Sequence, residues 1–281
     1  MLIKTDAFVL KSQKYHEADS LLTLFSKKTG RMTAVAKGSR RARSKMLAGI
    51  QPFTYSQFLL YEGRSMYTVN QVDPKAIFYS IREDYQKLAY ASYLAELVET
   101  EISEGQPHPQ LFYIFGKGLL LLSQSETNPE TLLRAFELHY MRVCGYEPQL
   151  KQCIDCSTTG VAGWSFSCSQ GGIVCPQCIS RFSDAQKISN TGLKLIRYLL
   201  SKPLHETAAI KIHPRLNNEI SELLKHYLLY HTARYQFKSL RFIAESKKAG
   251  TSHQISGLTV DRESDTFNSN NHNVRSNEKE E

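Results

Sequence analysis

The chain of 281 residues has no uncharged apolar run of the roughly 18 residues that a membrane-spanning helix needs. Its longest apolar cluster, Leu119 to Leu122, is flanked by Lys117 and Ser123. The N-terminus reaches a charged residue within its first few positions and lacks the apolar segment of a signal peptide. We therefore expect a cytoplasmic protein that makes no membrane contact and keeps its cysteines reduced.

Acidic residues are missing from the whole interval between Asp19 and Glu62. Residues 1–80 hold 13 Lys+Arg against 5 Asp+Glu, so their net charge of +8 equals that of the entire chain. Such a one-sided field attracts a polyanion, because neutralised phosphates release condensed counterions. The predicted nucleic-acid contacts are the eight basic residues of this interval: Lys27, Lys28, Arg31, Lys37, Arg40, Arg41, Arg43 and Lys45. The alternative is a solvated basic loop that only aids solubility.

The signatures of common enzyme classes are also absent. The chain has no Gly-x4-Gly-Lys-Ser/Thr loop, no Gly-x-Gly-x-x-Gly and no Gly-x-Ser-x-Gly elbow. His205-Glu206 is not followed by the second histidine of a His-Glu-x-x-His zinc protease. The basic interval offers no carboxylate to a catalytic metal. We predict a binding protein rather than an enzyme, with a metal-dependent nucleic-acid enzyme as one alternative.

Short apolar runs bounded by turn residues fill the first quarter of the chain. They predict strands near residues 2–11, 20–25, 32–36, 53–61 and 65–72, with a hairpin at Glu62-Gly63-Arg64. Five strands in about 70 residues favour a small closed barrel of the oligonucleotide-binding (OB) type. The basic stretch falls between the third and fourth strands, as a loop longer than an ordinary connector, which favours a functional role.

Apolar residues then recur at helical spacing, as in Leu88, Ala91, Ala95 and Val98. Asn128-Pro129 predicts a helix N-terminus with asparagine as the cap. The predicted fold class is a multidomain α+β protein. Its predicted parts are an OB-fold DNA-binding domain (1–80), a helical domain (81–150 and 189–245), a cysteine module (151–188) and a disordered polar tail (246–281).

Four of the six cysteines form the pattern Cys-x2-Cys, x18, Cys-x2-Cys: Cys153, Cys156, Cys175 and Cys178. Two residues between thiols let a tight turn place both sulfurs on one ion, and two such turns complete a tetrahedron. Four cysteines leave zinc no open position, so the predicted role of the ion is structural. The two other cysteines, Cys144 and Cys168, are predicted to be small buried residues.

The order of these parts resembles the RecO family of bacterial recombination mediators, over roughly residues 1–245. The most specific segments are Thr5-Asp6-Ala7-Phe8-Val9-Leu10, Tyr15-His16-Glu17-Ala18-Asp19, Thr29-Gly30-Arg31, and the first cysteine pair after Gly145-Tyr146-Glu147-Pro148. The tail beyond about residue 246 lies outside the resemblance.

The resemblance implies a DNA repair and recombination protein of the RecF pathway, active after DNA damage and located with the nucleoid when bound to DNA. It implies binding of single- and double-stranded DNA, annealing of complementary strands, and action with RecR to help load RecA. It further implies contact with the acidic C-terminal tail of single-strand-binding protein. From the residues alone, an RNA-binding module of translation or ribosome assembly is an alternative. Of the barrel aromatics Phe53, Tyr55, Phe58, Tyr61 and Tyr67, we expect most to be core and one or two to stack on bases.

Overall fold

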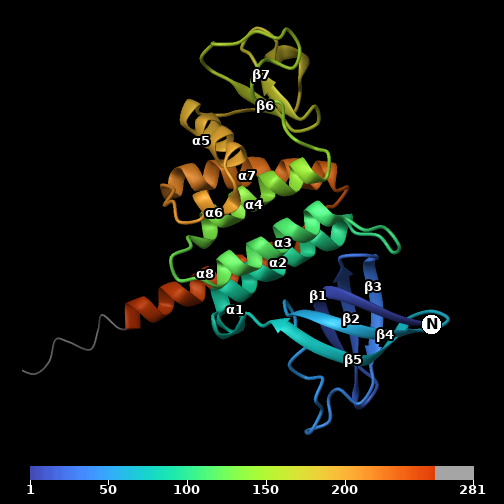
Figure 1. Ribbon diagram of the computed structural model, residues 1–281. Helices are drawn as coiled ribbons and strands as arrows, with labels where there is room; N and C mark the ends of the chain where they lie inside the picture. The colour runs from blue at the N-terminus through green and yellow to red at the C-terminus, as the bar shows by residue number, and fades with distance from the viewer. Residues whose placement is uncertain (257–281) are drawn as a thin grey trace, which may run out of the picture.

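The computed structural model describes the backbone of residues 1–256 and the side chains of residues 1–248. A small barrel, a group of long helices and a cysteine-containing module follow one another along the molecule (Figure 1). The barrel lies at one end, the module lies at the other, and the helices stand between them.

Five strands form the barrel. They are β1 (Leu2–Tyr15), β2 (Asp19–Ser26), β3 (Gly30–Ala36), β4 (Tyr55–Glu62) and β5 (Tyr67–Ala76). The strands are neighbours in the order β1-β2-β3-β5-β4, and β1 pairs with β4 to close the barrel. The predicted hairpin joins β4 to β5, whereas the β3–β5 pair is parallel. The closed five-stranded barrel confirms the predicted OB-type fold.

The barrel interior is filled by alternate side chains of its strands. Leu22, Leu24, Phe58 and Leu60 are fully buried there. Ile50, which lies outside the strands in the connection between β3 and β4, is also only 1% exposed and belongs to the same cluster. The long connection therefore contributes to the barrel core.

Aromatic rings join the barrel to the helices. The ring of Phe8 on β1 lies 4.9 Å from Phe112 and 5.3 Å from Phe115, both on α3, and Phe25 on β2 lies 5.2 Å from Phe112. These barrel side chains belong to the same buried cluster as the helical core. Barrel and helices are therefore held by a shared apolar core, which disfavours independent domain motion.

A second contact between the two parts needs a glycine. Gly30, at the start of β3, has φ +72°, and a Cβ there would lie 2.1 Å from the carbonyl oxygen of Gln106. The backbone N–H of Arg31 donates to the carbonyl of Ser103 at 3.0 Å. The segment between α2 and α3 thus lies directly on β3, at a separation that only glycine permits.

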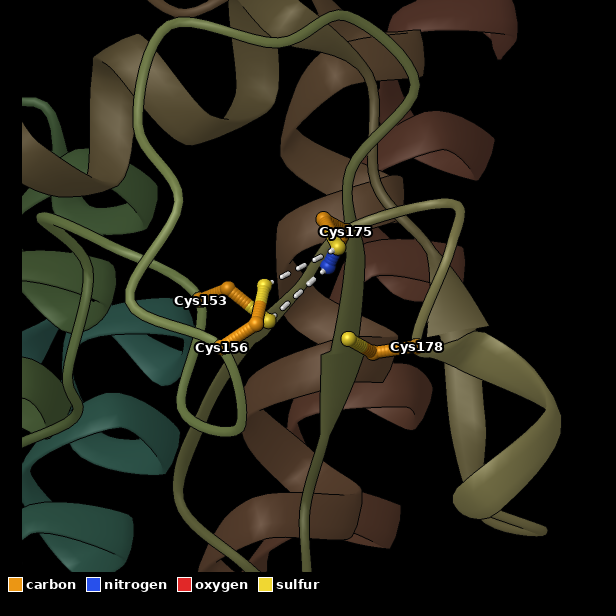
Figure 2. Close-up of side chains that lie close together, drawn as sticks. All are labelled: Cys153, Cys156, Cys175 and Cys178. Carbon is orange, nitrogen blue, oxygen red and sulfur yellow. Dashed lines mark hydrogen bonds between the residues drawn. The ribbon is translucent and has the colours of Figure 1, made fainter.

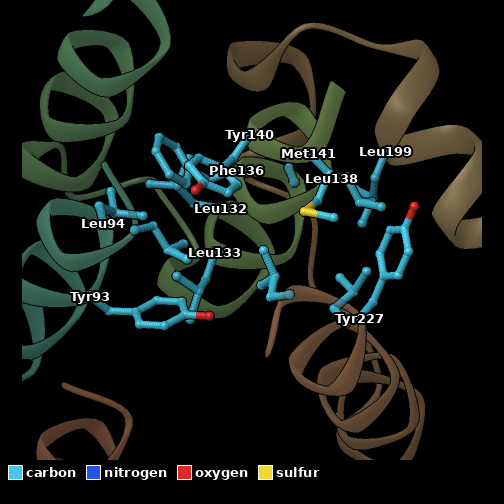
Figure 3. Close-up of a cluster of buried hydrophobic side chains, with 14 of the residues drawn as sticks. Tyr93, Leu94, Leu132, Leu133, Phe136, Leu138, Tyr140, Met141, Leu199 and Tyr227 are labelled. Atoms are coloured by element: carbon cyan, nitrogen blue, oxygen red, sulfur yellow. The ribbon is translucent and has the colours of Figure 1, made fainter. Parts of the chain in front are cut away.

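The helical part consists of eight helices among the described residues. They are α1 (Tyr79–Glu83), α2 (Tyr85–Glu101), α3 (Pro109–Ser123), α4 (Pro129–Val143), α5 (Asn190–Ser201), α6 (Leu204–Thr207), α7 (Pro214–His231) and α8 (Lys238–Ser256). α4 is central: its apolar side chains lie between Leu94 of α2 on one side and Leu199 of α5 and Tyr227 of α7 on the other (Figure 3). The predicted cap at Asn128 is confirmed, because its side chain accepts from the backbone N–H of Thr131 at 3.1 Å.

The helical core also contains charge. Arg134 and Glu137, both on α4, are 4% and 1% exposed, and Nε of Arg134 lies 3.2 Å from Oε2 of Glu137. The hydroxyl of Tyr93 on α2 donates to Oε1 of Glu137 at 2.9 Å. Burial raises the pKa of Glu137, and both Arg134 and the Tyr93 hydrogen bond act against that rise.

The last helix differs from the sequence-based expectation. α8 begins where the carboxylate of Glu96 accepts from the backbone N–H groups of Lys238 and Ser239, and it runs to Ser256. The boundary predicted at residue 245 therefore falls inside α8. Ser246 stays 2% exposed because the helix packs against its neighbours there, which polar composition alone does not reveal. The rest of the predicted polar tail, 257–281, lies outside the described residues.

Among the helices of the described region, none combines the length and apolar character that a bilayer crossing demands.

Candidate nucleic-acid interface and metal centre

The connection between β3 and β4, residues 37–54, carries the densest basic sequence of the chain. Its five cations are all exposed: Lys37, Arg40, Arg41, Arg43 and Lys45. In Figure 1 this connection leaves the barrel on the side away from the helices. We call residues 37–45 the cationic segment. Its charges face solvent, and none of them forms a salt bridge within the described part of the chain.

The cationic segment is fixed at its start by the turn between β1 and β2. The N–H of Gly38 donates to Oδ1 of Asp19 at 2.7 Å, and the N–H of Arg40 donates to the carbonyl of Ala18 at 2.9 Å. The buried hydroxyl of Ser39 donates to that of Ser20 at 2.8 Å. Asp19, the last acid before the basic interval, is thus used to hold the backbone rather than to neutralise a cation.

The other predicted DNA contacts do not all join the cationic segment. Lys27 and Lys28 are exposed, but they lie in the turn before β3, whereas Lys37 follows the end of β3. A strand of seven residues at about 3.3 Å per residue separates the two groups by roughly 20 Å. The structure therefore divides the predicted set between two ends of the barrel.

Arg31 takes a different position again. Its Nη2 lies 3.8 Å from Oε1 of Glu99 on α2, and Lys11 of β1 contacts the same carboxylate at 2.5 Å. The Arg31 side chain is 40% exposed. It lies at the junction of barrel and helices, where part of its charge is neutralised by Glu99.

Lys14 is a basic residue that sequence reasoning missed. It is exposed near the end of β1 and pairs across the strands with Ser20, whose hydroxyl contacts Ser39 of the cationic segment. Lys14 therefore stands beside the start of that segment. Its place directly before the β1–β2 turn is the sequence signal that could have indicated it.

The barrel aromatics are mostly packed, as expected. Phe58 is fully buried, Phe53 is 4% exposed, and the Tyr55 ring lies 4.9 Å from that of Phe8. Tyr67 packs partly buried against the barrel core. Tyr61 near the end of β4 is 56% exposed, which leaves it as the ring best placed to stack on a base.

The four predicted ligand cysteines meet at one point. Their sulfur atoms all lie within 4.8 Å of one another, and Sγ of Cys156 is 3.6 Å from Sγ of Cys175. Figure 2 shows Cys153 and Cys156 approaching from one turn and Cys175 and Cys178 from a second. Around an ion with Zn–S bonds of about 2.3 Å, tetrahedral sulfurs lie roughly 3.8 Å apart, so the cluster fits one metal ion.

Local backbone hydrogen bonds build the two turns. The N–H of Ser157 donates to the carbonyl of Cys153 at 3.0 Å, and the N–H of Cys178 donates to that of Cys175 at 3.1 Å. The N–H of Cys175 also points at Sγ of Cys153 over 3.4 Å. Hydrogen bonding with Thr158 lowers the pKa of Cys156 to about 6, which favours the thiolate that a metal requires.

The cysteine module contacts α7, and Tyr227 is central to that contact. Tyr227 of α7 donates from its hydroxyl to the carbonyl of Tyr146 at 2.8 Å, and its ring lies 5.3 Å from Phe166. Phe166 lies on β6 (Ser165–Ser167), the middle strand of a small sheet with β7 (Gly172–Val174) and β8 (Ala185–Lys187). A 3-10 turn (Ile179–Arg181) follows the second cysteine pair.

The two remaining cysteines have different surroundings. Cys168 is 6% exposed, and burial raises its pKa to about 11, as expected for an inert buried thiol. Cys144 is only half-buried and ends α4, and burial followed by the nearby Glu101 raises its pKa to about 12. Neither belongs to the four-cysteine cluster.

A closed OB barrel with an exposed cationic segment, joined by a shared core to helices and a four-cysteine centre, defines a multidomain class of OB-fold protein. The family model "Recombination protein O N terminal" matches residues 1–78, and "Recombination protein O C terminal" matches residues 82–241. The chain belongs to the RecO family of DNA repair proteins.

Curated relatives support the same assignment. The chain is 47% identical over 240 residues to the DNA repair protein RecO of Alkaliphilus metalliredigens, covering 85% of this chain and 98% of the relative. It is 37% identical over 242 residues to the protein of the same name from Pelotomaculum thermopropionicum, covering 86% and 93%. For the RecO of Acetivibrio thermocellus the identity is 33% over 226 residues, covering 80% and 90%.

Proposed function

We propose that this protein is a cytoplasmic recombination mediator that binds single- and double-stranded DNA and anneals complementary strands. In this proposal it acts with RecR to help load RecA onto strands coated by single-strand-binding protein. It works by binding and releasing strands, without catalysing a reaction. The observation that carries the proposal is the cationic segment, because five exposed cations without carboxylate partners are held on a barrel of the OB type.

Annealing requires two polyanionic strands to approach each other. Cations on the barrel lower the repulsion between them, and each phosphate contact releases counterions. In this proposal phosphate contacts supply most of the affinity. We therefore expect binding that depends strongly on salt and little on sequence, with Tyr61 adding a stacking contact.

We further propose that the four cysteines hold one zinc ion with a structural role. Four sulfurs within 4.8 Å of one another match the ligand set of closed zinc sites. The ion would bind the two cysteine turns together and so support the contact between the module and α7 at Tyr227.

For the acidic tail of single-strand-binding protein, we consider the two clefts that are lined by cations of residues 225–241. Lys225, Arg234 and Lys238 lie close together in the sequence but do not line one groove. Lys225 lines a cleft of about 290 Å³ between α4, α7 and α8, whereas Arg234 and Lys238 line another of about 420 Å³ beside the barrel.

We assign the tail to the cleft of Lys225. Its walls include the apolar side chains of Leu133, Leu240 and Ile243, which suit the apolar residues of a peptide. Its charged lining residues are the cations Arg134, Lys225 and Lys247 and the carboxylates Glu130 and Glu222, and Arg134 is buried in a salt bridge with Glu137. The assignment therefore rests on the apolar walls, with the 41% exposed side chain of Lys225 as a cation that an acidic peptide would reach.

The test is annealing of two complementary oligonucleotides coated with single-strand-binding protein, at two salt concentrations and without nucleotide or magnesium. The variant is R40A/R41A/R43A, in the cationic segment. The matched control, K187A/K194A/K211A, removes the same number of charges from exposed sites on β8, on α5 and in the connection between α6 and α7. We expect the wild type and the control to accelerate annealing and the first variant to lose the effect.

Binding titrations complete the design. The arginine variant should flatten the dependence of affinity on salt by up to about 0.7 in log–log slope per lost contact on single strands, or about 2 in total. An unchanged slope would remove the cationic segment as the contact surface. Tight binding without acceleration, or a preference for RNA of the same sequence, would favour the alternative of an RNA-binding module.

A further inference from the structure

Three potential metal ligands meet at a second place, apart from the four-cysteine centre. A carboxylate oxygen of Glu101, a ring nitrogen of His108 and Sγ of Cys144 all lie within 4.8 Å of one another, and all three residues are half-buried. They come from three helix ends: Glu101 is the last residue of α2, His108 caps the start of α3, and Cys144 caps the end of α4.

We propose that Glu101, His108 and Cys144 form a second zinc-binding site. Carboxylate oxygen, imidazole nitrogen and thiolate sulfur are the three side-chain donors that Zn²⁺ takes in proteins, and three protein ligands with one water form a common coordination sphere. Ligand atoms at about 2.0–2.3 Å from the ion lie roughly 3.3–3.8 Å apart, so shifts of about 1 Å close the site. Binding releases the proton of the Cys144 thiol.

Two of the three helix ends favour a cation, whereas the N-terminus of α3 carries partial positive charge. The C-terminal ends of α2 and α4 converge here, and each carries the partial negative charge of its free carbonyl groups. Glu101 forms no salt bridge with a lysine or arginine among the residues whose side chains are described. The negative charge at this point therefore lacks a cationic side chain to neutralise it.

His108 links the ion to the helix that it caps. Its Nδ1 accepts from the N–H of Leu111 at 3.3 Å, a long hydrogen bond, which leaves Nε2 as the protonated nitrogen. Whichever nitrogen binds the ion, Nδ1 stops accepting from Leu111, because it either becomes the ligand or takes up the ring proton. The ion must therefore replace a weak cap with a stronger connection between three helix ends.

The position suggests what the site does. Residues between α2 and α3 lie directly on β3, through the bonds of Ser103 to Arg31 and the close approach at Gly30. An ion that fixes both ends of this short segment would fix its contact with the barrel. The second zinc therefore stabilises the junction between the barrel and the helices.

The test is the number of zinc ions bound per chain by the full-length protein. Metal-free protein is reloaded with Zn²⁺, freed of excess metal, and examined by native mass spectrometry. Three variants each remove one ligand with little change of shape: C144S, E101Q and H108N, the last of which keeps a residue type favoured as a helix cap. The matched control is C168S, the same change at a cysteine outside both clusters.

We expect two ions for the wild type and for C168S, and one ion for C144S, E101Q and H108N. After reloading with Co²⁺, these three variants should keep the charge-transfer absorption of the four-cysteine centre and lose only the smaller share that the Cys144 thiolate adds in the wild type. The retained absorption verifies that they fold. One ion in the wild type that all three variants retain would overturn the proposal. Loss of an ion in C144S alone, with E101Q and H108N like the wild type, would overturn it as well.

Discussion

Gly116 on α3 lies directly beneath the ring of Phe8 on β1, so that a Cβ at position 116 would come within 2.7 Å of Cζ of Phe8. The absence of a side chain on the helix is thus what allows the barrel to seat its aromatic ring against α3. Phe8 is 5% exposed, and it is the ring that Tyr55, Phe112 and Phe115 all contact.

This packing predicts that a substitution of either Phe8 or Gly116 destabilises the protein. Phe8→Ala should reduce the free energy of unfolding by about 3–5 kcal/mol, because it leaves a cavity between barrel and helices. Gly116→Ala should reduce it by about 1–3 kcal/mol, because the added methyl group overpacks the contact. Urea denaturation measures both. Leu120→Ala, on an exposed part of the same helix, should stay within about 0.5 kcal/mol of the wild type. A stable Gly116→Ala protein would show that the ring has room to move.

The buried pair on α4 predicts a pH-dependent effect of Arg134→Ala. Without the guanidinium, Glu137 is a buried carboxylate without a cationic partner. The free energy of unfolding of the variant should therefore be about 3–5 kcal/mol lower than that of the wild type near neutral pH. The folded-state pKa of Glu137, already raised by burial, then rises further. A raised carboxyl pKa means that the folded state holds a proton that the unfolded state releases, so the variant loses stability as pH rises.

The difference in free energy of unfolding between the wild type and Arg134→Ala should therefore be larger at pH 8 than at pH 5. Urea denaturation at both pH values measures it. A double variant, Arg134→Leu with Glu137→Leu, removes both charges and should be much closer to the wild type. A difference in free energy of unfolding that does not depend on pH would show that the arginine acts through packing alone.

Metal removal should be visible through the single tryptophan of the chain. Trp164 lies in the cysteine module and is 5% exposed, and its carbonyl accepts from the N–H of Ile188. We expect a strong chelator to shift its emission to longer wavelength and to lower the melting temperature by roughly 5 °C or more, equal to about 2 kcal/mol.

Cys175→Ser should have the emission of the chelated protein even without chelator. Cys168→Ser, outside the cluster, should keep the native spectrum. If chelation leaves the emission of Trp164 unchanged, the four cysteines do not depend on a metal for their arrangement.

Binding of a labelled acidic peptide with the sequence of the tail of single-strand-binding protein can show which of the two clefts the peptide occupies. Lys225→Glu should weaken its binding at least tenfold, because it places a like charge in the cleft of α4, α7 and α8. Arg234→Glu makes the same change in the cleft beside the barrel and should leave binding within twofold. Fluorescence anisotropy gives both constants, and the reverse order of effects would move the peptide to the second cleft.

Much of the architecture could be predicted from local patterns. The Asn128 cap, the hairpin at Gly63 and the helical stripes depend on residues close in the sequence, and the structure has them where they were expected. The meeting of four cysteines also follows from spacing, because each pair forms its own turn.

What could not be predicted depends on pairing between distant segments. β3 lies parallel to β5, and the length of β3 carries Lys27 and Lys28 away from the cationic segment. Arg31 meets Glu99 only because α2 packs on the barrel. Cys144 looked like a small buried residue because nothing in the sequence shows that α2, α3 and α4 bring their ends together.

The backbone of the cationic segment has a consequence for how a strand would be held. Its hydrogen bonds form successive turns, with Arg41 N–H donating to Gly38 and Ser44 N–H donating to Arg41, and Ile50 seals the barrel beyond it. The arginines are thus carried by an ordered backbone rather than by a flexible loop. In the proposed function, a bound strand would lose its own disorder, whereas the protein would lose little, because the backbone of this segment is already ordered by these hydrogen bonds.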